Sequence, residues 1–314
     1  MSTSRSIAVH YDSDYERHDT GAGHPESILR YRTLCAALEQ RPEEIARFIS
    51  QRRATMQELQ YVHHASYVDL VYRDCETFAD ALRTGDTAIC EESYDVALRA
   101  TGAALDACDA VMSGTHQAIF SATRPPGHHG TANQGMGFCI FNHVAIAARY
   151  LQEKHGLKRI AIIDWDVHHG NGTEAIFLED ADVFYASLHE DHIYPFTGSV
   201  NTKGIGAGLG TTLNLPLPHA SDGAIALEQW DKHLTPALEA FAPEFILLSA
   251  GFDARIDDPI GGLRWDDETF AQMTRRSRAI ADRFARGRIV SILEGGYNPQ
   301  GLACAALAHL RALL

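Results

Sequence analysis

The feature that most constrains the fold of this chain is an alternation of short apolar runs with longer stretches of helical periodicity. The strand candidates are residues 6–10, 117–122, 159–164, 183–187, 211–215, 245–249 and 288–293. Helical patterns occupy residues 26–40, 64–73, 94–112, 142–155, 222–241, 267–286 and 301–313. Strands that alternate with helices predict an α/β fold, in which a mostly parallel, doubly wound sheet is flanked by helices.

The composition excludes several classes of function. The net charge is −14, and nonspecific nucleic-acid binding requires clustered Lys and Arg, so we expect no direct nucleic-acid partner. No run of 18 apolar residues is present, which argues against a membrane partner or a membrane span. The N-terminus lacks the apolar core of a signal peptide, and the six cysteines form no C-x-x-C pair. Reduced thiols and a cytoplasmic location are the simplest interpretation.

The chain has no internal repeat, low-complexity segment or linker, so we expect residues 1–314 to form a single catalytic domain. The sequence leaves the oligomeric state open, including a homo-oligomer. Loops rich in Gly, Pro, His, Asp and Tyr follow the predicted strands, at residues 124–137, 189–210, 251–267 and 295–300. Because loops on one edge of a sheet converge on one cleft, we expect the functional site there.

The most informative motif is DWDVHHGNG at residues 164–172, directly after a buried apolar strand. Asp166 and His168 are two residues apart, so an extended backbone points both side chains to the same side. A carboxylate oxygen and an imidazole nitrogen are two of the three protein ligands of a catalytic zinc site, which leaves its fourth position to water.

The third metal ligand should come from the end of another strand. Asp253 follows the predicted strand 245–249 and lies close to Gly251. By itself an Asp at this place would be expected to cap the following turn, but beside the 164–172 motif it completes a set of Asp166, His168 and Asp253. Two oxygens and one nitrogen suit Zn²⁺ and also accept Fe²⁺ or Co²⁺.

A second loop, RPPGHHG at residues 124–130, places two histidines between glycines. His128 and His129 could act as a proton-transfer pair, since imidazoles titrate near neutral pH. Asp164 could orient one of these rings through a hydrogen bond, or simply cap the following loop. Asn171 could accept a similar bond without carrying charge. A His-His pair is usually structural, but the rigid loop framed by glycines and the presence of the metal motif favour the catalytic interpretation.

The segment EGGYN at residues 294–298 follows the last predicted strand. The two glycines before Tyr297 permit a tightly turned loop from which the phenol projects. A phenol that faces a metal can donate a hydrogen bond to a developing oxyanion. Because Gly-Gly-Tyr is also a common turn, the position of the segment carries this inference.

With these motifs, the chain resembles the zinc-dependent histone deacetylase and acetylpolyamine amidohydrolase family, and most closely its class II-like members of bacterial type. The motifs RPPGHH, DWDVHHGNGT, SAGFDA with DPIGG, and EGGYN occur in the family's order, from about Gly23 to the Gly-Gly-Tyr loop. The resemblance implies an arginase/deacetylase-like fold and a metal-dependent deacetylase.

By position, the resemblance implies zinc ligands at Asp166, His168 and Asp253. It implies His129 as general base, His128 as a charged partner of Asp164, Asn171 as the partner of His129, and Tyr297 as the transition-state donor. A structural monovalent cation, usually K⁺, is implied near Asp164, Asp166, His168, Ser187 and Leu188.

The resemblance also implies a tunnel for the acyl-lysine side chain. Phe138 and Tyr194 correspond to its two aromatic walls, and many members carry Phe at the second position. Asp86 corresponds to a rim carboxylate that holds the substrate backbone. Ile260 stands where one type of polyamine-selective relative carries Glu, so that argument for polyamine selectivity does not apply here.

The implied reaction is removal of an acetyl or other acyl group from an amine by metal-activated water. Nε-acetyl-lysine in proteins or peptides is the expected substrate, acetylpolyamines are the alternative, and longer acyl groups stay open. An arginase-like ureohydrolase is less favoured, because its second metal needs Asp-x-His-x-Asp and Gly170 occupies the last position. A non-catalytic acyl-lysine reader is expected to lack a ligand, a histidine or the tyrosine, and all of them are present.

Overall fold

The computed structural model describes residues 6–314, which are built around one eight-stranded sheet in which every pairing is parallel. The strands are β1 Ile7–His10, β2 Ile45–Phe48, β3 Ala118–Ser121, β4 Ile160–Asp164, β5 Val183–Glu190, β6 Thr212–Leu217, β7 Phe245–Ala250 and β8 Ile289–Leu293. Their order across the sheet is β2-β1-β3-β8-β7-β4-β5-β6. The expected α/β class is therefore confirmed.

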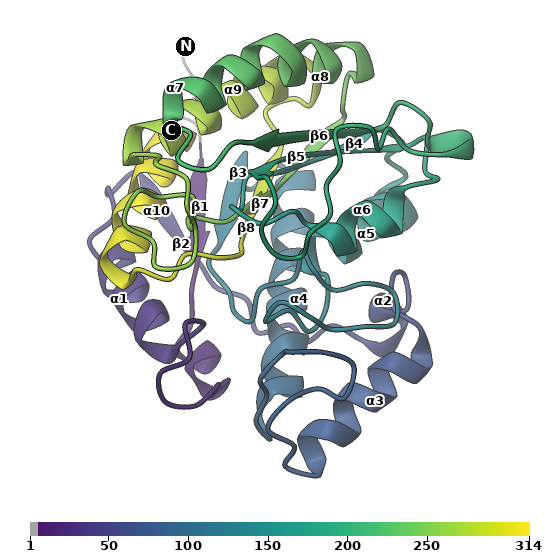
Figure 1. The fold of residues 1–314 in the computed structure, drawn as a ribbon, viewed down its shortest axis with the longest axis vertical. Helices are drawn as coiled ribbons and strands as arrows, with labels where there is room; N and C mark the ends of the chain where they lie inside the picture. Colours follow the sequence, from purple (N-terminus) through teal and green to yellow (C-terminus); the bar gives the residue numbers. More distant parts are fainter. Residues whose placement is uncertain (1–5) are drawn as a thin grey trace.

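Helices cover both faces of the sheet (Figure 1). One face carries α1 Ile28–Leu38, α7 Gly223–Gln229, α8 Thr235–Phe241, α9 Asp267–Phe284 and α10 Pro299–Leu313. The other face carries α2 Met56–Leu59, α3 Ala65–Glu76, α4 Ser93–Met112, α5 His143–His155 and α6 Asn171–Phe177. This is the doubly wound arrangement that the alternating sequence pattern predicts.

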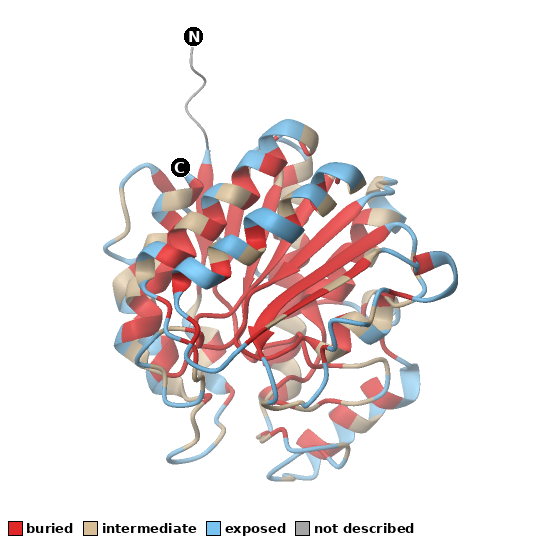
Figure 2. Ribbon diagram, turned by 45° about the horizontal axis from the view of Figure 1, so that its top comes forward, coloured by how far each residue is buried: buried red, intermediate tan, exposed pale blue. Residues whose placement is uncertain are grey.

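Two hydrophobic cores lie on opposite faces of the sheet, and the strands themselves are almost entirely buried (Figure 2). In β4, Ala161 and Ile163 belong to one core, whereas Ile160 and Ile162 belong to the other. Successive side chains of a strand point to opposite faces, so a strand that is covered on both sides is apolar throughout. This explains why β4 reads as a continuous apolar run.

The structure differs from the sequence-based expectation in a few short elements. The edge strand β2, the single turn α2 and the seven-residue α6 were not predicted, because such short segments show too little periodicity. The helix expected over residues 222–241 is interrupted by a π-helical turn at Trp230–Leu234, just before Pro236. Proline cannot donate the backbone hydrogen bond of a regular helix, which accounts for the irregular turn.

The four loops with chemically active residues follow β3, β4, β7 and β8. These strands are neighbours in the centre of the sheet, in the order β3-β8-β7-β4. Since all strands are parallel, their carboxyl ends meet at one edge, and the four loops converge there. Within residues 6–314, no helix has the length and apolar character needed to cross a membrane.

Candidate active site

Asp166, His168 and Asp253 come together at the carboxyl ends of β4 and β7, with ligand atoms that all lie within 4.8 Å of one another. His168 Nδ1 is 3.0 Å from Asp166 Oδ1 and 3.2 Å from Asp253 Oδ2. Apart from this ion-pair contact, the buried Oδ2 of Asp253 has no hydrogen-bond donor. The geometry thus unites the three residues that the sequence nominated as ligands.

The charge balance of this cluster fits a bound cation. Burial, and then the negative charge of Asp166, raise the pKa of Asp253 to about 7. Two buried carboxylates this close repel one another unless a positive charge lies between them. The other oxygens are already engaged, because Val167 donates to Asp253 Oδ1 and Gly295 donates to Asp166 Oδ2, each over 2.8 Å. A divalent ion would satisfy the remaining acceptor, Oδ2 of Asp253.

Glycine at position 295 is a geometric requirement of this cluster. A Cβ atom there would lie 2.6 Å from Oδ2 of Asp166 and still closer to Oδ2 of Asp253. Gly296 has a φ of +121°, a backbone conformation that other residues rarely adopt. The Gly-Gly pair therefore has two separate physical causes, close approach at the first glycine and backbone conformation at the second.

The two adjacent histidines have different partners. His128 Nδ1 lies 2.9 Å from Asp164 Oδ2, and His129 Nδ1 lies 2.8 Å from Asn171 Oδ1. Their ring centroids are 4.0 Å apart. The structure thus gives the first histidine a carboxylate partner and the second an amide, as the sequence pattern suggested.

The surroundings of the two imidazoles shift their pKa values in opposite directions. Burial alone would lower the pKa of His128, but the charge of Asp164, together with that of Asp166, raises it to about 10. Burial, and then the positive charge of His128, lower the pKa of His129 well below its usual value. At neutral pH the pair therefore consists of one charged ring and one neutral ring that can accept a proton.

Tyr297 closes the site from the loop after β8, with 8% of its surface exposed. Burial, and then the charges of Asp253 and Asp166, raise the pKa of Tyr297 well above the usual value, so its phenol stays protonated and can donate. Arg30, on α1, lies 5.2 Å from the centre of the Tyr297 ring. The Arg30 guanidinium also donates to the carbonyls of Glu294 and Gly296, over 3.1 and 3.0 Å.

A cavity of about 210 Å³ leads to this cluster. Its lining comprises Asp86, His129, Gly137, Phe138, His168, Tyr194, Ile260 and Tyr297. All four residues expected at the tunnel and its rim are in this set. Asp86 Oδ1 accepts hydrogen bonds from the Gly137 backbone, over 2.7 Å, and from the Tyr194 hydroxyl, over 3.5 Å.

The residues expected around a monovalent cation lie on and just beyond β4 and β5. Asp164 and Ser187 are partners in the strand register, and Leu188 follows in β5. Asp164 and Ser187 are fully buried. The Asp164 carboxylate accepts the backbone N–H of Asp166 over 3.1 Å. Cation binding at this place stays a prediction.

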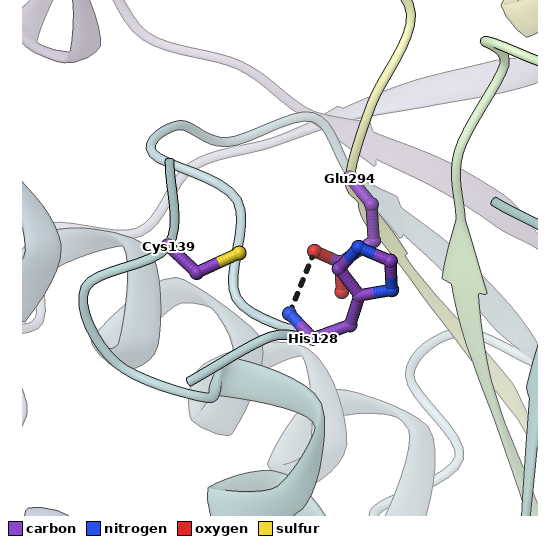
Figure 3. Close-up of side chains that lie close together, drawn as sticks. All are labelled: His128, Cys139 and Glu294. Atoms are coloured by element: carbon purple, nitrogen blue, oxygen red, sulfur yellow. Dashed lines mark hydrogen bonds between the residues drawn. The ribbon is translucent and has the colours of Figure 1, made fainter. Parts of the chain in front are cut away.

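A second group of potential metal ligands comprises His128, Cys139 and Glu294 (Figure 3). Glu294 Oε2 accepts the backbone N–H groups of Gly127 and His128, over 2.6 and 3.1 Å, and its Oε1 accepts the Ser249 hydroxyl over 2.9 Å. Both oxygens are thus engaged within the protein. This arrangement suits an anchor for the histidine loop better than a metal site.

Sequence reasoning did not assign roles to Glu294 and Arg30. Glu294 was visible only as the first letter of EGGYN, and Arg30 only as part of an amphipathic helix. Both are completely or almost completely buried, which is rare for charged side chains without partners. Their burial could be found only from the folded structure.

The chain has clear relatives among known proteins. A model of the histone deacetylase domain matches residues 24–313. "Histone deacetylase 14, chloroplastic" of Arabidopsis thaliana is 37% identical over 308 residues, which cover 93% of this chain and 73% of the relative. "Polyamine deacetylase HDAC10" of Homo sapiens is 39% identical over 278 residues, covering 85% of this chain and 41% of the relative.

A solved structure of the HDA15 HD domain is similar to this one with a TM-score of 0.91 and 33% identity, covering 99% of this chain and 88% of the other. The fold is arginase/deacetylase-like. Together with the buried cluster of metal ligands and the histidine pair, it defines a metal-dependent hydrolase. The chain belongs to the histone deacetylase family. The expected family and the expected class of enzyme, a deacetylase hydrolase, are confirmed at this level.

Proposed function

We propose that this protein removes acetyl or other acyl groups from amines, with Nε-acetyl-lysine of proteins or peptides as its main substrate. The observation that carries the proposal is the meeting of three metal-ligand side chains, a charged and a neutral histidine, and a protonated phenol at one cavity of about 210 Å³. Metal-assisted amide hydrolysis uses a Lewis acid, a base and an oxyanion donor, and this cavity offers ligands for the first and a group for each of the other two roles.

Asp166, His168 and Asp253 would hold the metal ion, with Zn²⁺ favoured and Fe²⁺ or Co²⁺ as alternatives. When bound, such an ion polarises an acyl carbonyl and lowers the pKa of water. His129, neutral and oriented by Asn171, takes the proton of the attacking water and later passes it to the leaving amine. His128, kept charged by Asp164, stabilises developing negative charge. Tyr297 donates its hydroxyl proton in a hydrogen bond to the tetrahedral oxyanion.

The cavity suits an extended alkyl chain that ends in an acylamide. Phe138 lies against Tyr297, with ring centroids 5.8 Å apart, and Tyr194 lies against His129 at 5.3 Å. These aromatic rings form apolar walls for the methylene groups of lysine. Asp86 stands at the mouth, where its carboxylate can accept hydrogen bonds from the substrate backbone.

Acetylpolyamines form the alternative substrate class. The relative named a polyamine deacetylase and the net charge of −14 favour cationic amines. Ile260 at the cavity, 37% exposed, gives such a substrate no carboxylate to bind. We therefore place acetyl-lysine before acetylpolyamines.

The test compares kcat/KM of the zinc-loaded protein for an acetyl-lysine peptide, acetylputrescine, acetylspermidine and lysines with longer acyl groups. We expect the acetyl-lysine peptide to give the highest value, and we expect dipicolinate to abolish activity until Zn²⁺ is restored. Metal-loaded protein that hydrolyses no acylamine would favour a reader, whereas two metal ions per chain would revive the ureohydrolase. A structural K⁺ ion, a cytoplasmic location and a single catalytic domain stay predictions, and the oligomeric state stays open.

A further inference from the structure

The carboxylate of Asp258 joins two loops that each contribute a residue to the lining of the cavity. Its Oδ2 accepts the backbone N–H groups of Tyr297 and Asn298, over 2.6 and 3.3 Å. Its Oδ1 accepts the N–H groups of Ile260 and Gly261, over 3.0 and 3.4 Å. One side chain, half-buried, thus satisfies four backbone donors from two separate segments of the chain.

Both segments contribute to the proposed active site. Ile260 and Tyr297 line the same cavity, from the loops after β7 and β8. No regular secondary structure joins these loops at this point. The hydrogen bonds of Asp258 therefore fix the position of the Tyr297 backbone relative to the wall of the cavity.

The loop that carries Tyr297 needs such support. It begins with Gly295 and Gly296, which restrict the backbone less than other residues do. Arg30 holds this loop by its carbonyl groups, at Glu294 and Gly296. Asp258 holds it by its N–H groups, at the residue that carries the phenol and at the next one. Removal of either contact would take away one of the restraints on the position of this loop.

We propose that Asp258 is a positioning residue, which keeps the Tyr297 phenol where the oxyanion forms. This inference rests on the proposed function of Tyr297 and extends it to a residue that does not touch substrate. Preorganised donors are effective because they need no rearrangement during the reaction, and an error of about 1 Å in position can cost about a hundredfold in rate.

The first test is Asp258→Asn. Asparagine has a single acceptor oxygen, so it can serve only one of the two pairs of N–H groups. We expect kcat on an acetyl-lysine peptide to fall by about ten- to a hundredfold, with KM little changed. Asp257→Asn is the matched control, because that carboxylate is exposed and pairs with Arg255. Equal effects of the two variants, or a loss confined to KM, would overturn the proposal.

A double-mutant cycle separates positioning from a general effect on folding. If Asp258 acts through Tyr297, Asp258→Asn should change kcat by less than twofold once Tyr297→Phe is present, because the donor that it positions is already absent. Additive losses in the double variant would exclude this route. Thermal unfolding of each variant identifies any that merely fails to fold.

A readout without turnover distinguishes failure of the inference from failure of the proposed function. We would place 3-fluorotyrosine at position 297 and record its ¹⁹F resonance. The protein with Asp258 should give one narrow line, and so should Asp257→Asn, whereas Asp258→Asn should broaden or split it. An unchanged line in Asp258→Asn would overturn the inference even if the protein hydrolyses no acylamine.

Discussion

At the scale of single residues, neighbouring side chains of one type do different chemistry because their partners differ. His128 and His129 are adjacent in the sequence, yet the pKa of one is raised to about 10 and that of the other is lowered. At His128 the charge of Asp164 outweighs the effect of burial, whereas His129 is buried beside the charged His128 and has only an amide partner. The motif identifies both histidines, but only their contacts show which ring is charged.

Tyr297→Phe tests the oxyanion donor at this scale. The substitution removes one hydroxyl that is needed mainly in the transition state, so kcat on an acetyl-lysine peptide should fall by about a hundredfold to a thousandfold. KM should change little, because the ground-state carbonyl gains less from this bond. Tyr72→Phe is the control, since that phenol is exposed and bonds only to Glu76. Full activity of Tyr297→Phe would remove this residue from the mechanism.

At the scale of elements, the site is made by loops that leave neighbouring parallel strands. β4 supplies Asp166 and His168, and the adjacent β7 supplies Asp253. The loop after β8 passes so close to these carboxylates that its second position, Gly295, must be glycine. The metal cluster and the Tyr297 loop are thus packed against each other as one unit.

Gly295→Ala tests that close packing. The added Cβ atom would displace Oδ2 of Asp166 and of Asp253, so the variant should hold less than one metal ion per chain after dialysis, with a matching loss of activity. Gly21→Ala serves as a comparison. Its φ of +88° makes the substitution strained, but among the described residues no atom beyond its chain neighbours lies within 4 Å of the added Cβ. If Gly295→Ala kept a full metal content, the crowding argument would fail.

At the scale of the whole molecule, burial on both faces of the sheet keeps several histidines neutral. Burial lowers the pKa of His63, His189 and His309 to about 3 and that of His143 to about 4. His309, for example, joins α10 to α9 and β8 through the hydroxyls of Thr274 and Ser291, over 2.7 and 2.9 Å. These rings are structural, and they make stability depend on pH.

The free energy of unfolding should fall as pH drops below about 6.5. Above that pH the rings are neutral in both states, so their contribution is fully present. Between pH 6.5 and about 4 the unfolded chain takes up protons that the folded state does not. Each such histidine lowers the free energy of unfolding by about 1.4 kcal/mol per pH unit.

Urea unfolding at pH values from 7.5 to 5 measures the slope of the free energy of unfolding against pH. His309→Gln should make it shallower by one proton, because it removes a ring that is buried and neutral in the folded state. Equal slopes for His309→Gln and the unsubstituted protein would contradict the assignment of His309 as neutral in the folded state.

The sequence by itself determined the local features of this protein. The apolar runs predicted seven of the eight strands, because strands buried on both faces must be apolar along their length. The spacing of Asp166 and His168 nominated two metal ligands, since two residues in extended backbone share a side. The positions of Asp253, the histidine pair and Tyr297 after other strands nominated the rest of the site, the family resemblance matched these residues, and the fold and family are confirmed.

Only the tertiary structure decided which distant groups touch. The roles of Arg30, Glu294 and Asp258 depend on contacts with backbone groups of loops, and the sequence does not show which backbone groups these side chains reach. The opposite charge states of His128 and His129 depend on burial and on partners some forty positions away in the chain. Local patterns reflect the period of the backbone, whereas desolvation and charge pairing arise only when separate segments pack together.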